Sequence, residues 1–245
     1  MNKSILKQIR QALKESVDEK TQAGTRRFFK EKIKYYGVKV PVVQKIGKQA
    51  FALIKGNPKN EIFALCEELW KSGYIEESFI ACNWSYYIHE EYETADFAVF
   101  ERWVETYLDN WASCDTLCNH SVGTLVEMYP KLVSKLKKWT KSENRWVRRS
   151  AAVSLIIPAR KGLFQAEIFG IAERLLYDRD DLVQKGYGWM LKAAAAFDRD
   201  AVFQFVMKHK AAMPRTALRY AIEKMPPEMR QKAMEKESKN HEPER

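Results

Sequence analysis

Apolar residues return every three or four positions along nearly the whole chain, which is the spacing of one face of an α-helix. The first segment is representative, because Ile5, Leu6, Ile9, Leu13 and Val17 would form one stripe. Glycine, proline and Ser-Gly breaks separate this segment from later ones of the same kind, and none alternates as a half-buried β-strand would. The pattern predicts about twelve to fourteen helices, over residues 3–17, 25–36, 41–54, 62–70, 75–88, 94–108, 122–129, 132–139, 146–157, 164–176, 182–197, 202–207 and 214–225.

The predicted connections are short, about two to eight residues, as expected between antiparallel neighbours. A chain with 46% hydrophobic residues can also bury a substantial core. These features predict an all-α fold of stacked antiparallel helix pairs, with residues 1–226 forming a single domain. The segment 227–245 is charged but neutral overall and poor in large apolar groups. We expect it to form a mobile tail after a short helix over residues 228–234.

One pair of residues carries candidate chemistry. Trp111 and Asp115 are four residues apart, so a helix would present the indole and the carboxylate on one face. A fixed carboxylate beside an aromatic wall suits a site where positive charge develops on a substrate. In the structural alternative, Asp115 caps or braces a helix beside a core tryptophan.

Two further residues repeat at a regular distance from this pair. Arg149 follows Trp111 after 38 residues, and Trp189 follows Arg149 after 40. Both steps are near the ~40-residue period of HEAT and armadillo helix pairs, in which equivalent positions line one surface. The spacing predicts a solenoid of about six to seven HEAT-like repeats, with Trp111, Asp115, Arg149 and Trp189 along one groove.

Positive charge is concentrated in blocks. The chain carries a formal net charge of +10 that is unevenly distributed, with +10 over residues 1–56, −9 over 57–110, +8 over 131–160 and +5 over 184–224. Because two basic blocks coincide with Arg149 and Trp189, the distribution favours a positive stripe for nucleic acid. The alternative is that these charges belong to ordinary solvated helix faces.

Several other classes of site lack their usual marks. The four cysteines are too scattered for a disulfide framework, and Cys114, Cys118 and His120 lack the fourth ligand and the Cys-x-x-Cys pair of a typical zinc site. We therefore expect reduced, buried thiols and no metal. No apolar run reaches a membrane span of about 20 residues, and Lys7 and Arg10 interrupt any signal-peptide core, so we expect a soluble cytoplasmic protein. Motifs for phosphate-binding loops, dinucleotides, zinc proteases and serine hydrolases are absent.

Two glycines lie inside a predicted helix, in the run Gly186-Tyr187-Gly188. Each costs roughly 1 kcal/mol relative to alanine in a helix interior. Close approach, either by a ligand backbone or by a neighbouring helix, would compensate for this cost.

Taken together, three motifs resemble the AlkD-like DNA alkylation repair family of HEAT-like-repeat DNA glycosylases. They are Trp111-x-x-x-Asp115, the Trp-x-x-Arg that ends at Arg149, and the Gln-Lys-x-x-Gly-Trp that ends at Trp189. The segments 27–30, 36–41 and 215–222 support the resemblance, which spans about residues 25–225.

The resemblance implies a monomeric enzyme without metal or nucleotide cofactor that excises N3- or N7-alkylated purines from double-stranded DNA, in the cytoplasm and, in a prokaryote, at the nucleoid. Asp115 matches the family's catalytic carboxylate, Trp111 and Trp189 match the indoles that flank the sugar of the damaged nucleotide, and Arg149 matches the arginine that holds the adjacent backbone. The lesion is expected to stay in the base stack rather than flip out. Candidate DNA-binding residues are Arg148, Arg145, Lys185, Lys39, Phe28, Arg215 and Arg219.

The chain departs from the family pattern at four positions. Ala112 stands where an acidic residue often follows the first tryptophan, and Cys114 replaces an aliphatic residue. Phe28 stands where a tyrosine can occur, and Lys39 where a polar amide can. These differences bear on substrate range and rate.

Two other functions stay open. A basic groove of this kind would also serve a protein that recognises DNA structure without excising bases. A helical-repeat scaffold for protein partners would instead use Trp111, Arg149 and Trp189 as core or peptide-binding residues. For the sugar-stacking role we expect Trp111 and Trp189 to be partly exposed, whereas core packing is expected of Trp70, Trp84, Trp103, Trp139 and Trp146.

Overall fold

The computed structural model describes residues 2–235. Within this range every extended regular element is a helix, and the one β-bridge, between Lys34 and Tyr74, is isolated. The predicted all-α fold is confirmed, while the number of repeats stays a prediction. The chain divides into two compact units, the first ending at Leu132 and the second beginning at Val133.

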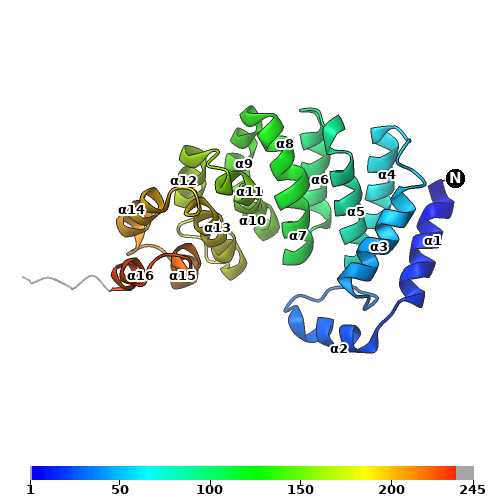
Figure 1. Ribbon diagram of the computed structural model, residues 1–245, viewed down its shortest axis with the longest axis horizontal. Coiled ribbons are helices and arrows are strands. Elements are labelled where there is room, and N and C mark those ends of the chain that lie inside the picture. The colour runs from blue at the N-terminus through cyan, green and yellow to red at the C-terminus, as the bar shows by residue number, and fades with distance from the viewer. Residues whose placement is uncertain (1, 236–245) are drawn as a thin grey trace, which may run out of the picture. The chain divides into compact units, whose positions relative to one another are not determined.

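The first unit consists of helices joined by short turns, and Figure 1 shows most of them standing side by side. Its core is rich in aromatic side chains, including the fully buried Trp84, Phe100 and Trp103. Helix α5 packs against α3, α4 and α7. The elements are α1 (Asn2–Glu15), α2 (Glu19–Phe28), α3 (Val40–Phe51), α4 (Lys59–Trp70), α5 (Ile75–Tyr87), the 3-10 turn η1 (His89–Glu91), α6 (Asp96–Tyr107), α7 (Trp111–Leu117), the π-helical turn η2 (Cys118–Val122), α8 (Gly123–Met128) and the 3-10 turn η3 (Pro130–Leu132).

The second unit is organised around α13, which packs against α10, α11, α12 and α15. Its core contains fully buried apolar side chains such as Tyr187, Met190 and Leu218. The elements are α9 (Val133–Trp139), α10 (Arg145–Val153), α11 (Ile156–Arg160), α12 (Gln165–Arg174), α13 (Asp181–Ala194), α14 (Arg199–His209), α15 (Arg215–Ile222) and α16 (Pro227–Met234).

Helix N-termini follow the capping residues in the sequence. Side-chain oxygens accept the otherwise unpaired N–H groups of the first turn. This occurs at Asp18 before α2, Asn110 before α7, Asn144 before α10, Asp180 before α13 and Asp198 before α14. Pro41 occupies the first turn of α3, where its missing N–H costs nothing.

The second predicted helix is wrong in position. The pattern placed it over residues 25–36, but α2 spans Glu19–Phe28 and residues 29–39 are non-helical. Asp18 starts the helix earlier by accepting Thr21 N–H at 2.8 Å. The N–H groups of Tyr36, Gly37 and Val38 bond to the carboxylate of Glu76 instead of continuing a helix.

The C-terminal segment begins as predicted. The short helix expected over residues 228–234 is present as α16. The rest of the predicted tail, residues 236–245, lies outside the described residues. Helix α1 also ends earlier than predicted, at Glu15, so Val17 is exposed while Ile5, Leu6, Ile9 and Leu13 are buried.

Candidate functional site

The first part of the candidate site lies on α7. Asn110 Oδ1 accepts Ser113 N–H at 2.9 Å and fixes the start of the helix at Trp111. Trp111 and Asp115 are each partly exposed, whereas Cys114 and Leu117 are fully buried. One face of α7 therefore packs into the core, and the predicted face with the indole and the carboxylate is accessible.

Polar contacts between buried groups tie α7, and the turn η2 (Cys118–Val122) that follows it, to α5. Ser85 and Ser121 share a hydrogen bond of 2.9 Å between their hydroxyls, and the Cys82 thiol donates to the Ser113 carbonyl oxygen at 3.9 Å. Immediately after α7 the backbone widens into the π-helical turn η2, an uncommon feature that occurs often at functional sites. The α7 face is thus held by packing and hydrogen bonds on its inner side.

The indole of Trp111 is covered in part by two phenylalanines. The Phe29 ring stacks on it with centroids 5.4 Å apart and an interplanar angle of 23°. The Phe28 ring meets it edge-on, also at 5.4 Å, and is itself 66% exposed. Phe28 was a predicted site residue, whereas the contribution of Phe29 was not foreseen, although its place next to Phe28 was the available signal.

The second part of the candidate site lies in the second unit, on α10 and α13. Arg149 is 5% exposed, and its Nη1 donates a hydrogen bond to the Leu182 carbonyl oxygen in the first turn of α13. Trp189 is partly exposed, two turns further along α13. The structure therefore brings Trp111, Asp115 and Phe28 together in one unit, and Arg149 and the helix of Trp189 together in the other. Convergence of all four central residues on one groove stays a prediction.

The two glycines inside α13 have different neighbours. A Cβ atom at position 188 would be 2.7 Å from the Ala217 carbonyl oxygen, so α15 packs directly on the backbone there. A Cβ atom at position 186 would be 3.3 Å from Arg149 Cγ. Of the two explanations for these glycines, approach by a neighbouring helix is confirmed for Gly188, and Gly186 makes space for the arginine.

Comparison with known proteins decides the family. The family model for DNA alkylation repair enzymes matches residues 9–225. The chain belongs to the DNA alkylation repair enzyme family. A solved structure described as a predicted DNA alkylation repair enzyme from Enterococcus faecalis superposes with a TM-score of 0.78 at 16% sequence identity, covering 86% of this chain and 98% of that one. At this identity the likeness shows a shared fold. No curated protein matches the chain.

In this DNA alkylation repair enzyme, several predicted DNA-binding cations are paired with carboxylates. Arg148 binds Asp178 through Nε at 2.6 Å and Nη2 at 3.3 Å, and Arg145 Nε is 3.2 Å from Asp180. Lys185 is 3.0 Å from Asp181 on the same helix, and Lys39 is 3.0 Å from Asp18. Contacts of these cations with DNA stay predictions, and the sequence did not reveal their acidic partners.

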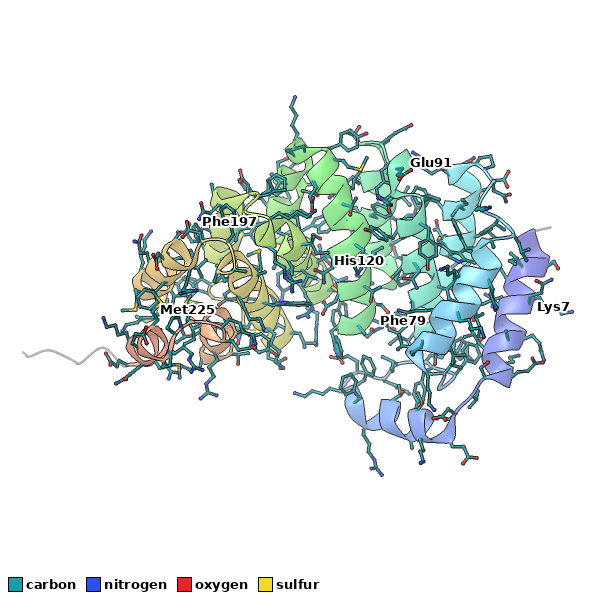
Figure 2. All side chains as sticks on the ribbon, viewed as in Figure 1. Lys7, Phe79, Glu91, His120, Phe197 and Met225 are labelled. Carbon is teal, nitrogen blue, oxygen red and sulfur yellow. The ribbon has the colours of Figure 1, made fainter. Side chains whose placement is uncertain are left out.

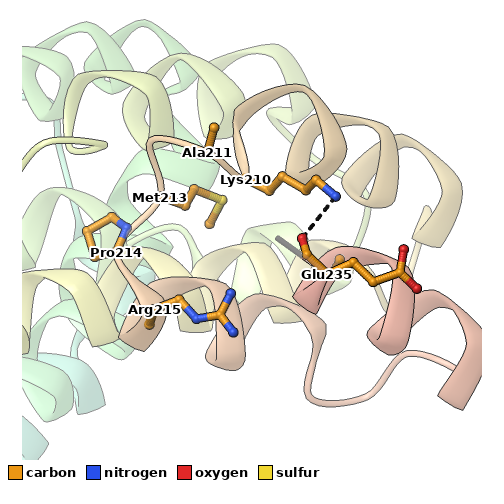
Figure 3. A pocket seen from close by; sticks show the side chains of 7 residues that line it. Lys210, Ala211, Met213, Pro214, Arg215 and Glu235 are labelled. Carbon is orange, nitrogen blue, oxygen red and sulfur yellow. Dashed lines mark hydrogen bonds between the residues drawn. The ribbon is translucent and has the colours of Figure 1, made fainter. Parts of the chain in front are cut away.

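The last two predicted DNA-binding residues lie on α15. Arg215 lines a pocket of about 490 Å³ together with Lys210, Met213 and Glu235 (Figure 3), and its guanidinium is 3.5 Å from the Met234 carbonyl oxygen. Lys210 donates to the carbonyl oxygens of Lys232 at 3.1 Å and Glu235 at 3.3 Å. Both cations thus satisfy carbonyl groups at the C-terminal end of α16, a place that favours positive charge. Arg219 is exposed on the same helix as Arg215.

Tryptophan burial agrees with the expectation from sequence. Trp70, Trp84, Trp103, Trp139 and Trp146 are all buried, and Trp111 and Trp189 are partly exposed. The expected buried thiols are also confirmed, since Cys66, Cys82, Cys114 and Cys118 are free and buried.

The described residues contain no cluster of three or more side chains suited to hold a metal ion. Cys114 and Cys118 lie in the core, whereas His120 is exposed, so these three do not share a site. Over residues 2–235, no helix combines the length and the apolar character needed to cross a bilayer.

Proposed function

We propose that this DNA alkylation repair enzyme is a glycosylase that hydrolyses the N-glycosidic bond of N3- or N7-alkylated purines in double-stranded DNA. The observation that carries the proposal is the accessible face of α7, with the Asp115 carboxylate one turn from the Trp111 indole. Family membership supports DNA as the substrate class. Residues 1–226 would form the catalytic domain of a monomer that acts on cytoplasmic DNA, at the nucleoid in a prokaryote.

The chemistry needs little from the protein at the leaving group. A purine alkylated at N3 or N7 is cationic, so when the bond from C1′ to the base breaks, the electron pair neutralises the base and no acid is required. The deoxyribose becomes oxocarbenium-like, as in glycoside hydrolysis. Water then adds to C1′ and loses a proton, which gives a free alkylated base and an abasic site.

Asp115 would act on that sugar. A fixed carboxylate in a site with little water stabilises developing positive charge strongly. The same group can orient the attacking water and accept its proton. The role needs a carboxylate at this position, because an amide of the same shape carries no negative charge.

The aromatic and basic residues would position the damaged nucleotide. Indole faces beside the cationic sugar offer about 0.5–2 kcal/mol of cation–π attraction each, and we assign this role to Trp111 and Trp189. Arg149 would hold the neighbouring phosphate without reading sequence. Working from the sugar and phosphate side leaves the lesion in the base stack, so bulky adducts would be accepted as well as methyl groups.

The test is release of free base from a duplex that contains N7-methylguanine. Wild-type protein and Asp115→Asn are incubated with the duplex, and the base is separated by chromatography, while binding to the same duplex is measured in parallel. We expect release by the wild type and loss of release, with binding retained, in the variant. Release at the wild-type rate by Asp115→Asn would refute the chemical assignment. Binding without release by both proteins would favour a DNA-structure-binding protein instead.

A further inference from the structure

Residues 18–39, between α1 and α3, form an arm of the first unit that runs away from these two helices and returns beside its starting point (Figure 1). The Asp18 N–H donates to the Gly37 carbonyl oxygen at 3.0 Å, and Lys39 Nζ lies 3.0 Å from Asp18 Oδ2. Helix α2 occupies the outgoing half and stands apart from α1 and α3 in Figure 1. The two ends of the arm, Asp18 and residues 36–39, are thus bonded to each other, and this region is called the base of the arm.

Glu76, in the first turn of α5, binds the returning backbone of the arm at residues 36–38. Its Oε1 accepts the N–H groups of Gly37 at 2.8 Å and Val38 at 3.1 Å, and its Oε2 accepts that of Tyr36 at 3.0 Å. The side chain is 3% exposed. Hydrogen bonds to an ionised acceptor are about twice as strong as neutral ones, and the N-terminus of α5 adds favourable dipoles. Three successive backbone groups are therefore fixed by one buried carboxylate.

A second set of contacts fixes the side chains of the base. The Tyr36 hydroxyl donates to Glu77 at 2.8 Å, and Arg10 Nε donates to the same carboxylate at 3.0 Å. The Tyr36 ring stacks on Tyr74 at 4.0 Å with an angle of 11°. Glu77 therefore braces α1 and a side chain of the base, whereas Glu76 determines the course of the arm's backbone.

The far end of the arm meets the candidate site. Phe28 and Phe29 contact the Trp111 indole at 5.4 Å each. None of the described side chains of α2 is buried, and Figure 2 shows them projecting around the helix. Because α2 contributes little to the core, the place of Phe29 depends on the base of the arm and on the contact with Trp111.

We propose that Glu76 is a positioning residue for the Trp111 site, acting through the arm and the stacked ring of Phe29. The inference rests on the proposed glycosylase function and adds a residue remote from the chemistry to it. Glu76 sets the path of residues 36–38, the arm carries Phe29, and Phe29 fixes the plane of the indole before DNA binds. Misplacement of a positioning group by about 1 Å can cost on the order of 100-fold in rate.

Two measurements test the proposal: the environment of the Trp111 indole and, separately, the rate of base release. Protein labelled with 5-fluorotryptophan is studied by fluorine NMR, with the Trp111 resonance assigned from Trp111→Phe. We expect Glu76→Gln and Phe29→Leu to shift or broaden that resonance and to slow single-turnover release of N7-methylguanine about tenfold or more.

The matched control is Asp96→Asn, which removes another buried carboxylate of this unit. Asp96 pairs with Lys59 at 2.9 Å and accepts the Glu93 N–H at 2.7 Å. It should lower thermal stability and leave both the Trp111 resonance and the release rate unchanged.

A double-mutant cycle decides whether the two residues act through one route. If Glu76 works through Phe29, the double variant should be no slower than the slower single variant, because groups that act in one network are not additive. Rate losses that simply multiply, or a Trp111 resonance unmoved by Glu76→Gln in a folded protein, would overturn the proposal. If the wild type releases no base, the glycosylase function fails, and the NMR result still decides whether Glu76 positions the indole.

Discussion

The Arg149 side chain lies against Gly186, so closely that a Cβ atom at position 186 would be 3.3 Å from Arg149 Cγ. Arg149 is buried, and its Nη1 reaches the carbonyl oxygen of Leu182 one turn earlier on α13. A glycine in the middle of a helix lowers the stability of that helix. At position 186 the missing side chain leaves room for the long side chain of Arg149 to lie along the surface of α13. Gly186 thus couples the conformation of α13 to the orientation of Arg149.

This relationship predicts opposite effects of one substitution on stability and activity. Gly186→Ala removes a helix penalty of up to about 1 kcal/mol, so thermal stability should be retained or slightly raised. The added methyl group displaces Arg149 by a few tenths of an ångström, and release of alkylated base should slow about tenfold. Thermal unfolding and single-turnover assays on the same preparation measure both. A variant as fast as the wild type would show that Arg149 needs no fixed path along α13.

The neighbouring glycine provides the matched control. A Cβ atom at position 188 would be 2.7 Å from both the Ala217 carbonyl oxygen and Tyr220 Cβ. Gly188→Ala must therefore separate α13 from α15, and we expect a loss of about 1–3 kcal/mol in the free energy of unfolding. The contrast between Gly186→Ala and Gly188→Ala distinguishes an effect on Arg149 from an effect on helix packing.

Arg148 should matter more for stability than for DNA binding. Its guanidinium binds Asp178 through two nitrogens and also donates from Nη1 to the carbonyl oxygens of Ser142 and Glu143, each at 2.9 Å. Only 19% of the arginine side chain and 8% of the aspartate side chain are exposed. Arg148→Ala should lower the free energy of unfolding by about 2–3 kcal/mol, because it leaves charged and carbonyl acceptors without their donor.

Chemical denaturation measures that loss, and duplex affinity is measured at a temperature where the variant remains folded. We expect Asp178→Asn to be destabilising as well, and the double variant to lose less than the sum of the two single losses. If Arg148→Ala were as stable as the wild type but bound DNA much more weakly, the ion pair would be incidental and the arginine would serve DNA directly.

The sequence predicted most of the helices because their information is local. Apolar spacing and capping residues are read within a few positions, and Asn110, Asp180 and Asp198 act as caps where they occur. The position of the second helix was predicted wrongly because it depends on contacts with residues that are distant in the sequence. Phe28, Phe29, Ile33 and Tyr36 have helical spacing, yet the N–H of Tyr36 is taken by Glu76, 40 residues further along the chain.

The same distinction holds for the candidate site. The shared face of Trp111 and Asp115 follows from a separation of four residues on a helix, and the partial exposure of Trp111 was anticipated from its assigned role. The pairing of Arg148 with Asp178, 30 residues away, and the stacking of Phe29 on Trp111 were not. A single sequence shows which residues are unusual, but tertiary contacts decide which cations are already paired.

The base of the arm should weaken in acid because of Asp18. The Thr21 hydroxyl at 2.7 Å and the Thr21 N–H, together with the Lys39 ammonium, lower the pKa of the Asp18 carboxyl from its usual 3.8 to about 2. A carboxyl whose pKa is lower in the folded state stabilises that state above its usual pKa. This contribution is therefore complete above pH 3.8 and disappears as the pH falls through about 2.

Amide hydrogen exchange of α2 as a function of pH tests this expectation after correction for intrinsic rates. Protection should fall between about pH 4 and pH 2 in the wild type. Asp18→Asn, which can still cap the helix but does not titrate, should show no such step. An identical step in the variant would assign the titration to another group.

Arg219 should contact DNA phosphate, and salt dependence is the way to measure it. It is exposed on α15, unlike Arg148, which is occupied by Asp178. Each phosphate contact that is lost reduces the dependence of log affinity on log salt by about one unit. Arg219→Ala should therefore lower duplex affinity at low salt and reduce the slope by about one, whereas Arg148→Ala should leave the slope unchanged.

Lys224→Ala is the matched control for Arg219→Ala. It removes a cation that lies just after the same helix and is not among the predicted DNA-binding residues. Fluorescence anisotropy titrations of plain duplex over a range of salt concentrations give the slopes, and equal slopes for the wild type, Arg219→Ala and Lys224→Ala would place the DNA-binding surface elsewhere on the protein.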